Sequence, residues 1–350
     1  MVQQLTINGG QGPYPVIVGP GAFMAHIPQI AGDYGRIVIV TNETIAPLFG
    51  EDLRDALPNS NLIVLPDGEA YKTLDTVRAI YDGMLATGAN RGTLVLGLGG
   101  GVIGDMAGFA AATFMRGVDY LQAPTTLLAM VDASIGGKVG VNLPQGKNLV
   151  GAFKDPVAVV ADTDTLEILM RLKPLEYTYG MAEVIKAGLL RDPWLLDYPR
   201  SGSQEEMVAR AIRVKAHFVE KDRLEQGVRA YLNLGHTFAH AIEKVSKHEA
   251  AHGLAVGIGL AAAARLSWRL GLADWDLVQQ VVNRLEGWNL MHMNYWDPDA
   301  IWEAMRHDKK WRDGVSRFVL LRGIGDPVLV EDVAREDVIA VLDDMMPPME

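Results

Sequence analysis

His236 and His240 stand four residues apart, so on a helix both rings would leave the same face, one turn from each other. Glu183 and Lys186 lie three apart in an earlier segment, and His252 follows the histidine pair. Imidazole and carboxylate are ligands that suit zinc, cobalt or iron. Three such side chains from separate segments would leave a coordination position open for a substrate. The pattern predicts a catalytic metal site, and by spacing alone both histidines of the pair are candidate ligands.

The elements that must carry these residues change character along the chain. In the first part, short runs rich in β-branched residues alternate with helical spacing, such as that of residues 74–87. This alternation predicts a layered domain with a buried parallel sheet. The expected strands cover residues 36–40, 61–65, 93–97 and 157–160.

The second part of the chain is predicted to be mostly helical. After about residue 165, leucine, alanine and arginine recur at helical spacing, with one late strand expected at 317–321. The apolar run 253–264 is too short to span a bilayer and is interpreted as a buried helix. We therefore expect an α/β N-terminal Rossmann-like domain with a parallel sheet at residues 1–162, and a mostly α-helical C-terminal domain at residues 163–350.

Composition narrows the classes of partner. The net charge of −11 argues against a nucleic-acid partner, because a phosphate backbone requires a basic face. The absence of cysteine excludes disulfides, thiolate metal sites and a cysteine nucleophile. The first residues lack the basic and apolar segments of a secretory signal, so we expect a cytoplasmic protein without a membrane partner.

A glycine-rich turn follows the strand predicted at 93–97. Gly99, Gly101 and Gly104 fit the pattern G-x-G-x-x-G between a strand and a helix, where the backbone can approach a pyrophosphate. The alternative is a tight turn with close packing of helix against strand. The turn also comes after two earlier strand–helix units, which indicates a dinucleotide fold different from the standard NAD domain.

Cationic side chains accompany a second glycine-rich segment, residues 132–148, which is interpreted as a loop. It is not a Walker A loop, because Val139 follows Lys138 where Ser or Thr is required. Its lysines and Asn148 could bind phosphate or carboxylate. The cations in the motifs of the chain form either a local anion pocket or ordinary surface charge: Arg116, Lys138, Lys147, Lys186, Lys215, Arg229, Lys309 and Lys310.

Together these motifs resemble the 3-dehydroquinate synthase family, which belongs to the sugar phosphate cyclase superfamily. The matching segments occur in the order found in the family and span most of the chain. They are residues 67–72, 99–105, 116–117, 124–126, 132–148, 180–186, 225–243, 252–253 and 308–310. The resemblance implies the dehydroquinate synthase-like fold.

The resemblance implies one divalent metal ion, zinc or cobalt, held by Glu183, His236 and His252. His240 would then be a base and hydrogen-bonding partner near the substrate, and not a ligand. It also implies bound NAD. The residues implied for NAD are Asp67, Gly68, Glu69, Ala70, Tyr71, Lys72, Gly101, Val102, Ile103, Gly104, Asp105, Thr125, Thr126, Lys138, Lys147, Thr165, Leu166, Glu167 and Ile168.

The implied substrate is a small anionic sugar phosphate, 3-deoxy-arabino-heptulosonate 7-phosphate (DAHP). Its conversion to 3-dehydroquinate and phosphate, in the shikimate pathway, combines transient oxidation by NAD, phosphate elimination, reduction and intramolecular aldol cyclisation. The resemblance also implies a homodimer. The residues implied near the substrate are Arg116, Asp132, Lys138, Asn148, Lys186, Lys215, Glu225, Arg229, Asn233, His240, and one of Lys309 and Lys310.

Three features depart from the family pattern. Leu254 stands where the family has glutamate, so a carboxylate behind the metal ligands is missing there. Residues 167–177 lack the sequence motif usual in the family, and Ala239 replaces a glycine. By spacing Glu243 could be a ligand, but it is interpreted as a residue that caps or pairs on the helix surface.

Other functions compete with this interpretation. One is another sugar phosphate cyclase, such as 2-deoxy-scyllo-inosose synthase acting on glucose 6-phosphate. A second is a metal-dependent polyol dehydrogenase of similar layout, and a non-catalytic binding protein is the third. His240 and the Gly146-Lys147-Asn148 run favour the dehydroquinate synthase reaction.

Overall fold

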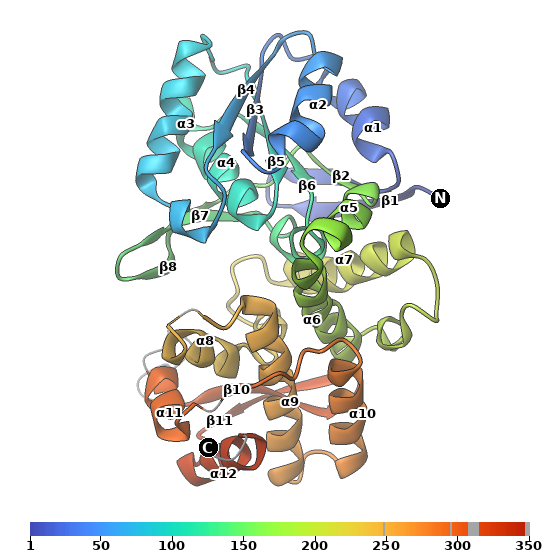
Figure 1. Cartoon of the computed structure of the whole chain (residues 1–350), viewed down its shortest axis with the longest axis vertical. Helices are drawn as coiled ribbons and strands as arrows, with labels where there is room; N and C mark the ends of the chain where they lie inside the picture. Colours follow the sequence, from blue (N-terminus) through green and yellow to red (C-terminus); the bar gives the residue numbers. More distant parts are fainter. Residues whose placement is uncertain (248, 295, 307–314, 347–350) are drawn as a thin grey trace. The chain divides into compact units, whose positions relative to one another are not determined.

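The computed structural model describes residues 1–247, 249–294, 296–306 and 315–346 of the chain (Figure 1). The chain forms two compact units. Unit 1 comprises Met1–Tyr177 with Ser203–Ala216, and unit 2 comprises Thr178–Gly202 with His217–Glu350. The division into domains at residues 162 and 163 stays a prediction.

Unit 1 is built on a sheet that has seven strands within the described residues, in the order β1-β2-β9-β6-β5-β3-β4 (Figure 1). Only β1 and β2 pair antiparallel among these strands; the other neighbours pair in parallel. The strands are β1 (Gln3–Gly9), β2 (Gly12–Gly19), β3 (Ile37–Asn42), β4 (Ser60–Leu65), β5 (Leu94–Gly99), β6 (Asp119–Pro124) and β9 (Ala158–Asp162). The four strands predicted from β-branched runs are therefore confirmed.

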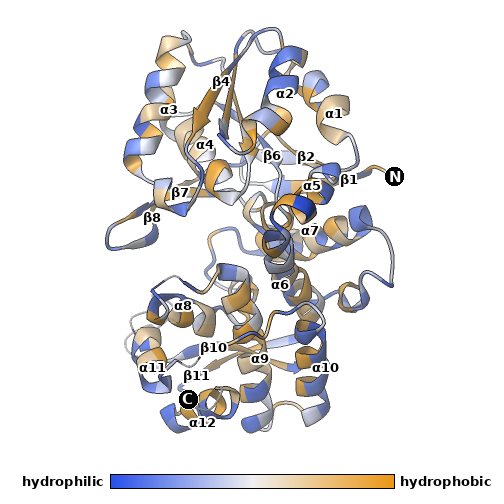
Figure 2. Ribbon diagram, in the orientation of Figure 1, coloured by the Kyte–Doolittle hydropathy of each residue, from blue (hydrophilic) through white to orange (hydrophobic). Residues whose placement is uncertain are grey.

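Helices cover both faces of this sheet, which explains why its central strands lack an alternating pattern. All six residues of β3 and all six of β5 are buried. One core packs α1 and α2 against the sheet, and another packs α3 and α4 against the opposite side. Figure 2 shows the hydrophobic colour on β4 between these layers. The helices are α1 (Ala22–Ala31), α2 (Glu51–Ala56), α3 (Leu74–Ala86), α4 (Gly101–Thr113) and α5 (Asp164–Leu172).

Two hairpins of unit 1 were not predicted, and the first is formed by β1 and β2. Pro13 and Pro15 in β2 argue against a strand, but both precede Val16, where the pairing of β2 with β9 begins. The interpretation of residues 132–148 as a loop was wrong for most of the segment. There, β7 (Lys138–Leu143) and β8 (Gly146–Phe153) form an antiparallel hairpin.

Unit 2 is mostly helical, as predicted. The late strand is β10 (Arg317–Gly323), which pairs with β11 (Asp326–Glu331). The apolar run 253–264 lies inside α9 (His252–Arg269) and is largely buried, as expected. Among the described helices, none combines the length and apolarity needed to cross a membrane. The other helices are α8 (His236–Val245), α10 (Trp275–Glu286), α11 (Pro298–Arg306) and α12 (Arg335–Met345), while α6 (Pro174–Leu190) and α7 (Gln204–Lys221) each have residues in both units.

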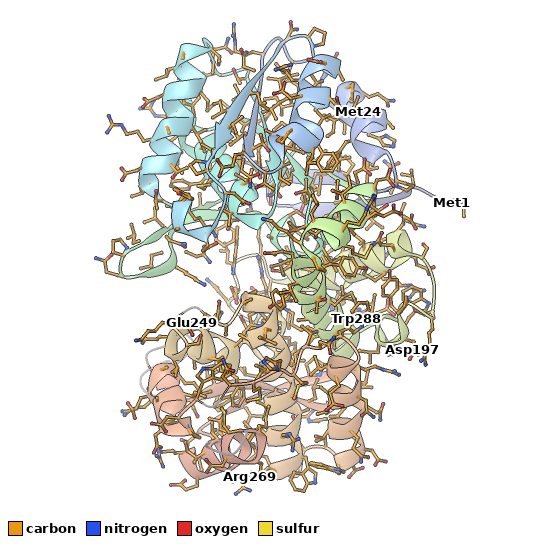
Figure 3. The ribbon with its side chains drawn as sticks, in the orientation of Figure 1. Met1, Met24, Asp197, Glu249, Arg269 and Trp288 are labelled. Atoms are coloured by element: carbon orange, nitrogen blue, oxygen red, sulfur yellow. The ribbon has the colours of Figure 1, made fainter. Side chains whose placement is uncertain are left out.

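Helix α10 illustrates how unit 2 is held together. Its buried residues recur at helical spacing, and Figure 2 shows hydrophobic and hydrophilic colours alternating along it. Its Arg284 forms an ion pair with Asp197, and Trp288 just beyond its end stacks on Tyr198 with ring centroids 6.4 Å apart. Asp197 and Trp288 are labelled in Figure 3. The short helices of the chain are η1 (Ala46–Gly50), η2 (Glu69–Tyr71), η3 (Phe114–Arg116), η4 (Ala129–Ala133), η5 (Pro193–Asp197) and η6 (Val228–Asn233).

Candidate functional site

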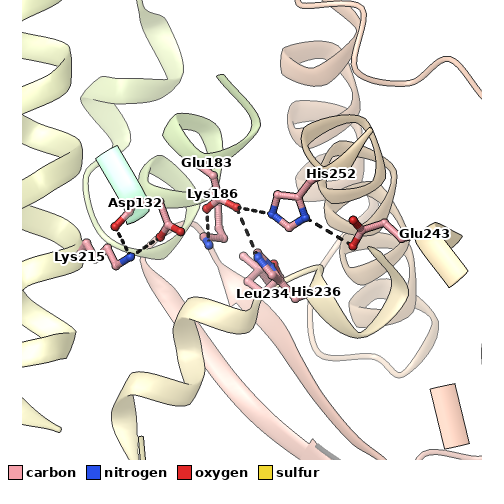
Figure 4. A network of polar contacts seen from close by, with 8 residues as sticks. All are labelled: Asp132, Glu183, Lys186, Lys215, Leu234, His236, Glu243 and His252. Carbon is pink, nitrogen blue, oxygen red and sulfur yellow. Dashed lines mark hydrogen bonds and ion pairs between the residues drawn. The ribbon is translucent and has the colours of Figure 1, made fainter. Parts of the chain in front are cut away.

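Helix α6 brings a carboxylate and an ammonium into the interior of unit 2. Glu183 and Lys186 are 3% and 4% exposed, and they form an ion pair through Oε2 of the glutamate (Figure 4). Burial alone would raise the pKa of Glu183, but the Lys186 ammonium holds that pKa well below its usual range. Glu183 is therefore an ionised carboxylate at neutral pH, with Oε1 directed away from the lysine contact.

Close packing at glycines brings α8 and α9 to this carboxylate. Gly253, which follows His252, lies so close to α6 that an added Cβ would be 2.2 Å from the carbonyl oxygen of Tyr179. Gly235, which precedes His236, has a φ of 77°, and an added Cβ there would be 2.8 Å from the backbone nitrogen of Leu260 on α9. A side chain at Gly235 would displace the start of α8, and one at Gly253 would displace the start of α9. Each helix begins with a histidine, so the two glycines allow His236 and His252 to approach Glu183.

Glu183, His236 and His252 each direct one ligand atom to a common point, and these atoms all lie within 4.8 Å of one another (Figure 4). Oε1 of Glu183 is 3.4 Å from Nε2 of His236 and 3.8 Å from Nε2 of His252. Ligands about 2.0–2.1 Å from a tetrahedral ion lie roughly 3.3–3.4 Å from each other. The three groups therefore fit a zinc or cobalt ion with one position left for another ligand.

The hydrogen bonds around the three groups point to the same conclusion. Oε1 of Glu183 is buried and has no hydrogen-bond partner among the residues that the structure describes. Nδ1 of His236 lies 3.1 Å from the carbonyl oxygen of Leu234, to which a protonated Nδ1 donates. That hydrogen bond leaves the lone pair on Nε2, the atom that faces Glu183. A buried carboxylate oxygen without a described hydrogen-bond partner, facing an imidazole nitrogen, is the donor chemistry that a divalent ion satisfies.

His240 lies on the same helix but outside this group. Its ring centroid is 5.7 Å from that of His236, with the rings nearly perpendicular, and its side chain is exposed. Spacing alone left both histidines as candidate ligands. In the structure, the group of three ligand atoms contains His236 and not His240. The role of His240 as a base stays a prediction.

In unit 1, the residues implied for NAD lie at one edge of the sheet. Asp67 follows β4, Gly101 follows β5, Thr125 follows β6 and Thr165 follows β9. Because these strands are parallel, their carboxyl ends meet at the same edge. The chain passes from β3 to β4 on one side and then to β5 on the other, so the connections reverse direction at β3. Nucleotides bind outside the carboxyl ends of strands at such a reversal.

The glycines of the turn between β5 and α4 allow close packing as well as the approach of a pyrophosphate. Helix α4 begins at Gly101, so backbone N–H groups of its first turn face the strand ends, where a pyrophosphate is favoured. Gly104 lies against β6, where Tyr120 donates its hydroxyl hydrogen to the Gly104 carbonyl oxygen at 2.6 Å. A Cβ on Gly104 would be 3.2 Å from Gln122. The two interpretations of this turn are thus compatible, since different glycines serve each.

Lys72 connects three of the segments implied for NAD and substrate. Its side chain is 6% exposed, and Nζ lies 2.6 Å from Oδ2 of Asp105 and 2.6 Å from Oδ1 of Asn148. Asn142 in β7 donates to Glu69 at 2.7 Å and accepts the backbone N–H of Asn148. The β7–β8 hairpin is therefore fastened to the 67–72 segment.

Asp67 is likewise held in place at the strand ends. It accepts hydrogen bonds from Asn42 and Thr44 at 2.8 Å each, and from Lys173 at 3.0 Å. Burial would raise its pKa, but the bonds from Lys173 and Thr44 outweigh this and lower the pKa of Asp67. An ionised carboxylate is therefore fixed beside the carboxyl ends of β3 and β4.

The residues implied near the substrate are distributed over both units. Within unit 1, Lys215 on α7 binds Oδ1 of Asp132 at 2.6 Å (Figure 4), and Arg116 and Lys138 are exposed. Within unit 2, Asn233 donates to Glu225 at 2.8 Å, and buried Arg229 donates to the carbonyl oxygen of Arg223. Lys309 and Lys310 lie outside the described residues, whereas Lys147 lies exposed in β8.

Two residues near the site were missed or misread from the sequence. Asp222 accepts the backbone N–H groups of Gln226, Gly227 and Arg229 and so shapes the loop before η6. Glu243 was expected on the helix surface, which was wrong: it is 6% exposed and lies 3.5 Å from Nδ1 of His252 (Figure 4). Its position seven residues after His236 places it two turns along the same helix face, a signal present in the sequence.

Comparison with known proteins gives matches over most of the chain. Residues 62–174 match the family described as 3-dehydroquinate synthase N-terminal, and residues 180–311 match 3-dehydroquinate synthase C-terminal. A 3-dehydroquinate synthase from Halorhodospira halophila is 45% identical over 93% of this chain and 95% of its own.

Two solved structures share the fold. A 2-epi-5-epi-valiolone synthase from Streptomyces hygroscopicus, with NAD⁺ and Zn²⁺ bound, is 30% identical with a TM-score of 0.85, over 95% of this chain and 96% of its own. A 2-deoxy-scyllo-inosose synthase complexed with carbaglucose-6-phosphate, NAD⁺ and Co²⁺ is 24% identical with a TM-score of 0.86, over 98% and 99% of the two chains.

Proposed function

The chain belongs to the 3-dehydroquinate synthase family, and from this premise we propose that it converts DAHP to 3-dehydroquinate and phosphate at the Glu183–His236–His252 group. The observation that carries the proposal is the convergence of one ionised carboxylate and two imidazole nitrogens from three helices. The geometry of this group fits a zinc or cobalt ion with one open position.

Glu183, His236 and His252 would hold the divalent ion, which supplies Lewis acidity toward a hydroxyl and then a carbonyl oxygen of the substrate. Lys186 contributes by binding Oε2 of Glu183, so that Oε1 remains for the ion. The same ammonium keeps the carboxylate ionised inside the unit. His240, exposed one turn from His236, is proposed to accept a proton from the substrate through its imidazole nitrogen.

The carboxyl edge of the parallel sheet is proposed to hold NAD, which takes a hydride and later returns it, without net consumption. The first turn of α4 at Gly101 would receive the pyrophosphate. Asp67, fixed by Asn42, Thr44 and Lys173, offers a carboxylate acceptor to a hydroxyl of the nucleotide. The ion pair of Lys72 with Asp105 would hold the 67–72 segment against α4.

The cationic residues are proposed to bind the carboxylate and phosphate of the sugar. Arg116, Lys138, Lys215, Arg229 and Asn233 belong to this proposed set. Asp222 and Glu225 position Arg229 and Asn233. Fixing both anionic ends mainly supplies orientation, which the closing aldol step requires. One of Lys309 and Lys310 completes this proposed set.

A homodimer and a cytoplasmic location are part of the same proposal. The membership of the 3-dehydroquinate synthase family supports both parts of the proposal. Sedimentation velocity of the purified protein tests the oligomeric state, with a particle of twice the 38.1 kDa chain mass as the expected result.

The reaction itself is tested by incubating purified protein with NAD, zinc or cobalt, and either DAHP or glucose 6-phosphate. Phosphate release from DAHP alone, without accumulation of reduced NAD, is the expected result. Release from glucose 6-phosphate only would assign the chain to a different cyclase. Net formation of reduced NAD from a polyol would instead identify a dehydrogenase.

A further inference from the structure

We propose that Glu243 is the positioning residue that orients His252 toward the metal ion, an inference that rests on the proposed function. Glu243 sits on α8, whereas His252 opens α9. Oε2 of Glu243 lies 3.5 Å from Nδ1 of His252, on the far side of the ring from Glu183 (Figure 4). The imidazole therefore stands between two carboxylates, one directed to each of its nitrogens.

The burial of Glu243 indicates that its contact with His252 contributes to the structure of the site. Its side chain is 7% exposed, and a carboxylate removed from water costs free energy unless it is paired or hydrogen-bonded. A surface position on the same helix would avoid that cost, as exposed Lys244 does. The buried carboxylate recovers part of this cost by accepting the Nδ1 hydrogen of His252. In turn it fixes the tautomer, because the lone pair is then on Nε2.

His252 needs such a partner more than His236 does. The side chain of His252 is 35% exposed, against 12% for His236, and it sits at the first residue of its helix. His236 is oriented by the backbone carbonyl of Leu234, which no substitution removes. The Nδ1 contact of His252 is made with a side chain, so this contact can be removed by a substitution at Glu243.

The test uses two substitutions of similar volume in the full-length protein. Glu243→Gln keeps an oxygen that accepts the Nδ1 hydrogen, whereas Glu243→Leu removes every acceptor. The zinc dissociation constant, measured by competition with a chelator, should rise about 10- to 100-fold in Glu243→Leu and only a few-fold in Glu243→Gln. The visible absorption of the cobalt-loaded protein should change in Glu243→Leu and be kept in Glu243→Gln.

Controls separate positioning from folding. Glu249→Gln alters an exposed carboxylate just beyond α8 (Figure 3) and should leave zinc affinity unchanged. Thermal unfolding of the metal-free variants detects general destabilisation, which would affect both ligands' helices alike. Rescue of affinity and spectrum by Gln, at equal stability of the metal-free proteins, is specific to the hydrogen bond.

The outcomes distinguish this inference from the proposed function. If wild-type protein binds one ion, His252→Ala loses it, and Glu243→Leu binds as tightly as wild type, the inference about Glu243 is overturned while the metal site stands. Equal losses in Glu243→Gln and Glu243→Leu would also overturn it. If wild-type protein binds no ion at all, the proposed function itself fails.

Discussion

Oε1 of Glu183 and Nε2 of His236 face each other across 3.4 Å, although they belong to helices far apart in the sequence. This separation is long for a strong hydrogen bond and close to the distance between two ligands of one tetrahedral ion. Lys186 occupies the other oxygen of the same carboxylate. The relationship accounts for a carboxylate buried here: one oxygen is balanced by an ammonium, and the other would be balanced by the proposed metal ion.

Removing one ligand should abolish metal binding without unfolding the protein. His252→Ala should lower the metal content from one ion per chain to near zero, because two remaining ligands bind weakly. The side chain is partly exposed, so no core cavity results. His240→Ala is the matched control: it should retain the ion while activity falls by about 10²- to 10⁴-fold, the usual contribution of a general base. Elemental analysis of both dialysed variants checks this, and retained metal in His252→Ala would contradict the assignment.

Metal affinity should depend on pH through the histidines and not through Glu183. The pKa of Glu183 is held well below its usual range, so this carboxylate stays ionised as the solution is acidified. His236 and His252 must be neutral to bind. Affinity should therefore be constant above the imidazole pKa of about 6.5 and fall by up to about 100-fold per pH unit below it. Chelator competition across this range gives the slope, and a flat profile would exclude both imidazoles as ligands.

Lys138 should serve the sugar more than the nucleotide. Lys138→Ala removes an ammonium at the start of β7 and should raise the KM for DAHP by roughly 10- to 100-fold, the worth of one hydrogen bond to a charged group. The dissociation constant of NAD should change little. Lys154→Ala, just beyond the end of β8, is the control and should leave both values unchanged. Unaltered kinetics in Lys138→Ala would refute the role.

Breaking the buried Lys72–Asp105 ion pair should destabilise unit 1, because the remaining carboxylate would be left buried without its ammonium partner. Lys72→Met leaves Asp105 without the ammonium and should lower the free energy of unfolding by about 3 kcal/mol. Adding Asp105→Asn should recover part of that loss, since the unpaired charge is then gone. Urea unfolding of the single and double variants measures the coupling. Arg306→Met, which breaks an exposed pair with Glu303, should cost at most about 1 kcal/mol; strictly additive effects at Lys72 and Asp105 would contradict the prediction.

Local patterns predicted the parts of the fold in which one residue type dominates a segment. The strands β3, β5 and β9 are buried throughout because helices cover both faces of their sheet, whereas the edge strand β4 is mostly half-buried. The helices α8 and α9 could be located from spacing and from the run 253–264. The β7–β8 hairpin could not, because residues of β8 are mostly exposed and their strand conformation depends on pairing with β7.

The candidate site was predictable in its residue types but not in its contacts. Spacing indicated that His236 and His240 share a helix face, yet only packing against α6 and α9 decides that His236 joins Glu183. Glu243 was misread because its burial arises from α9 lying across α8. Likewise, the ion pair of Lys72 with Asp105 joins segments whose proximity depends on the order of strands in the sheet.

The central claim is that Glu183, His236 and His252 bind one ion together. Anomalous diffraction from crystals grown with NAD and zinc or cobalt, recorded on both sides of the metal absorption edge, tests it directly. We expect a single strong peak about 2 Å from Oε1 of Glu183 and from Nε2 of both histidines. A peak bound by other side chains, or none among these three, would contradict the account.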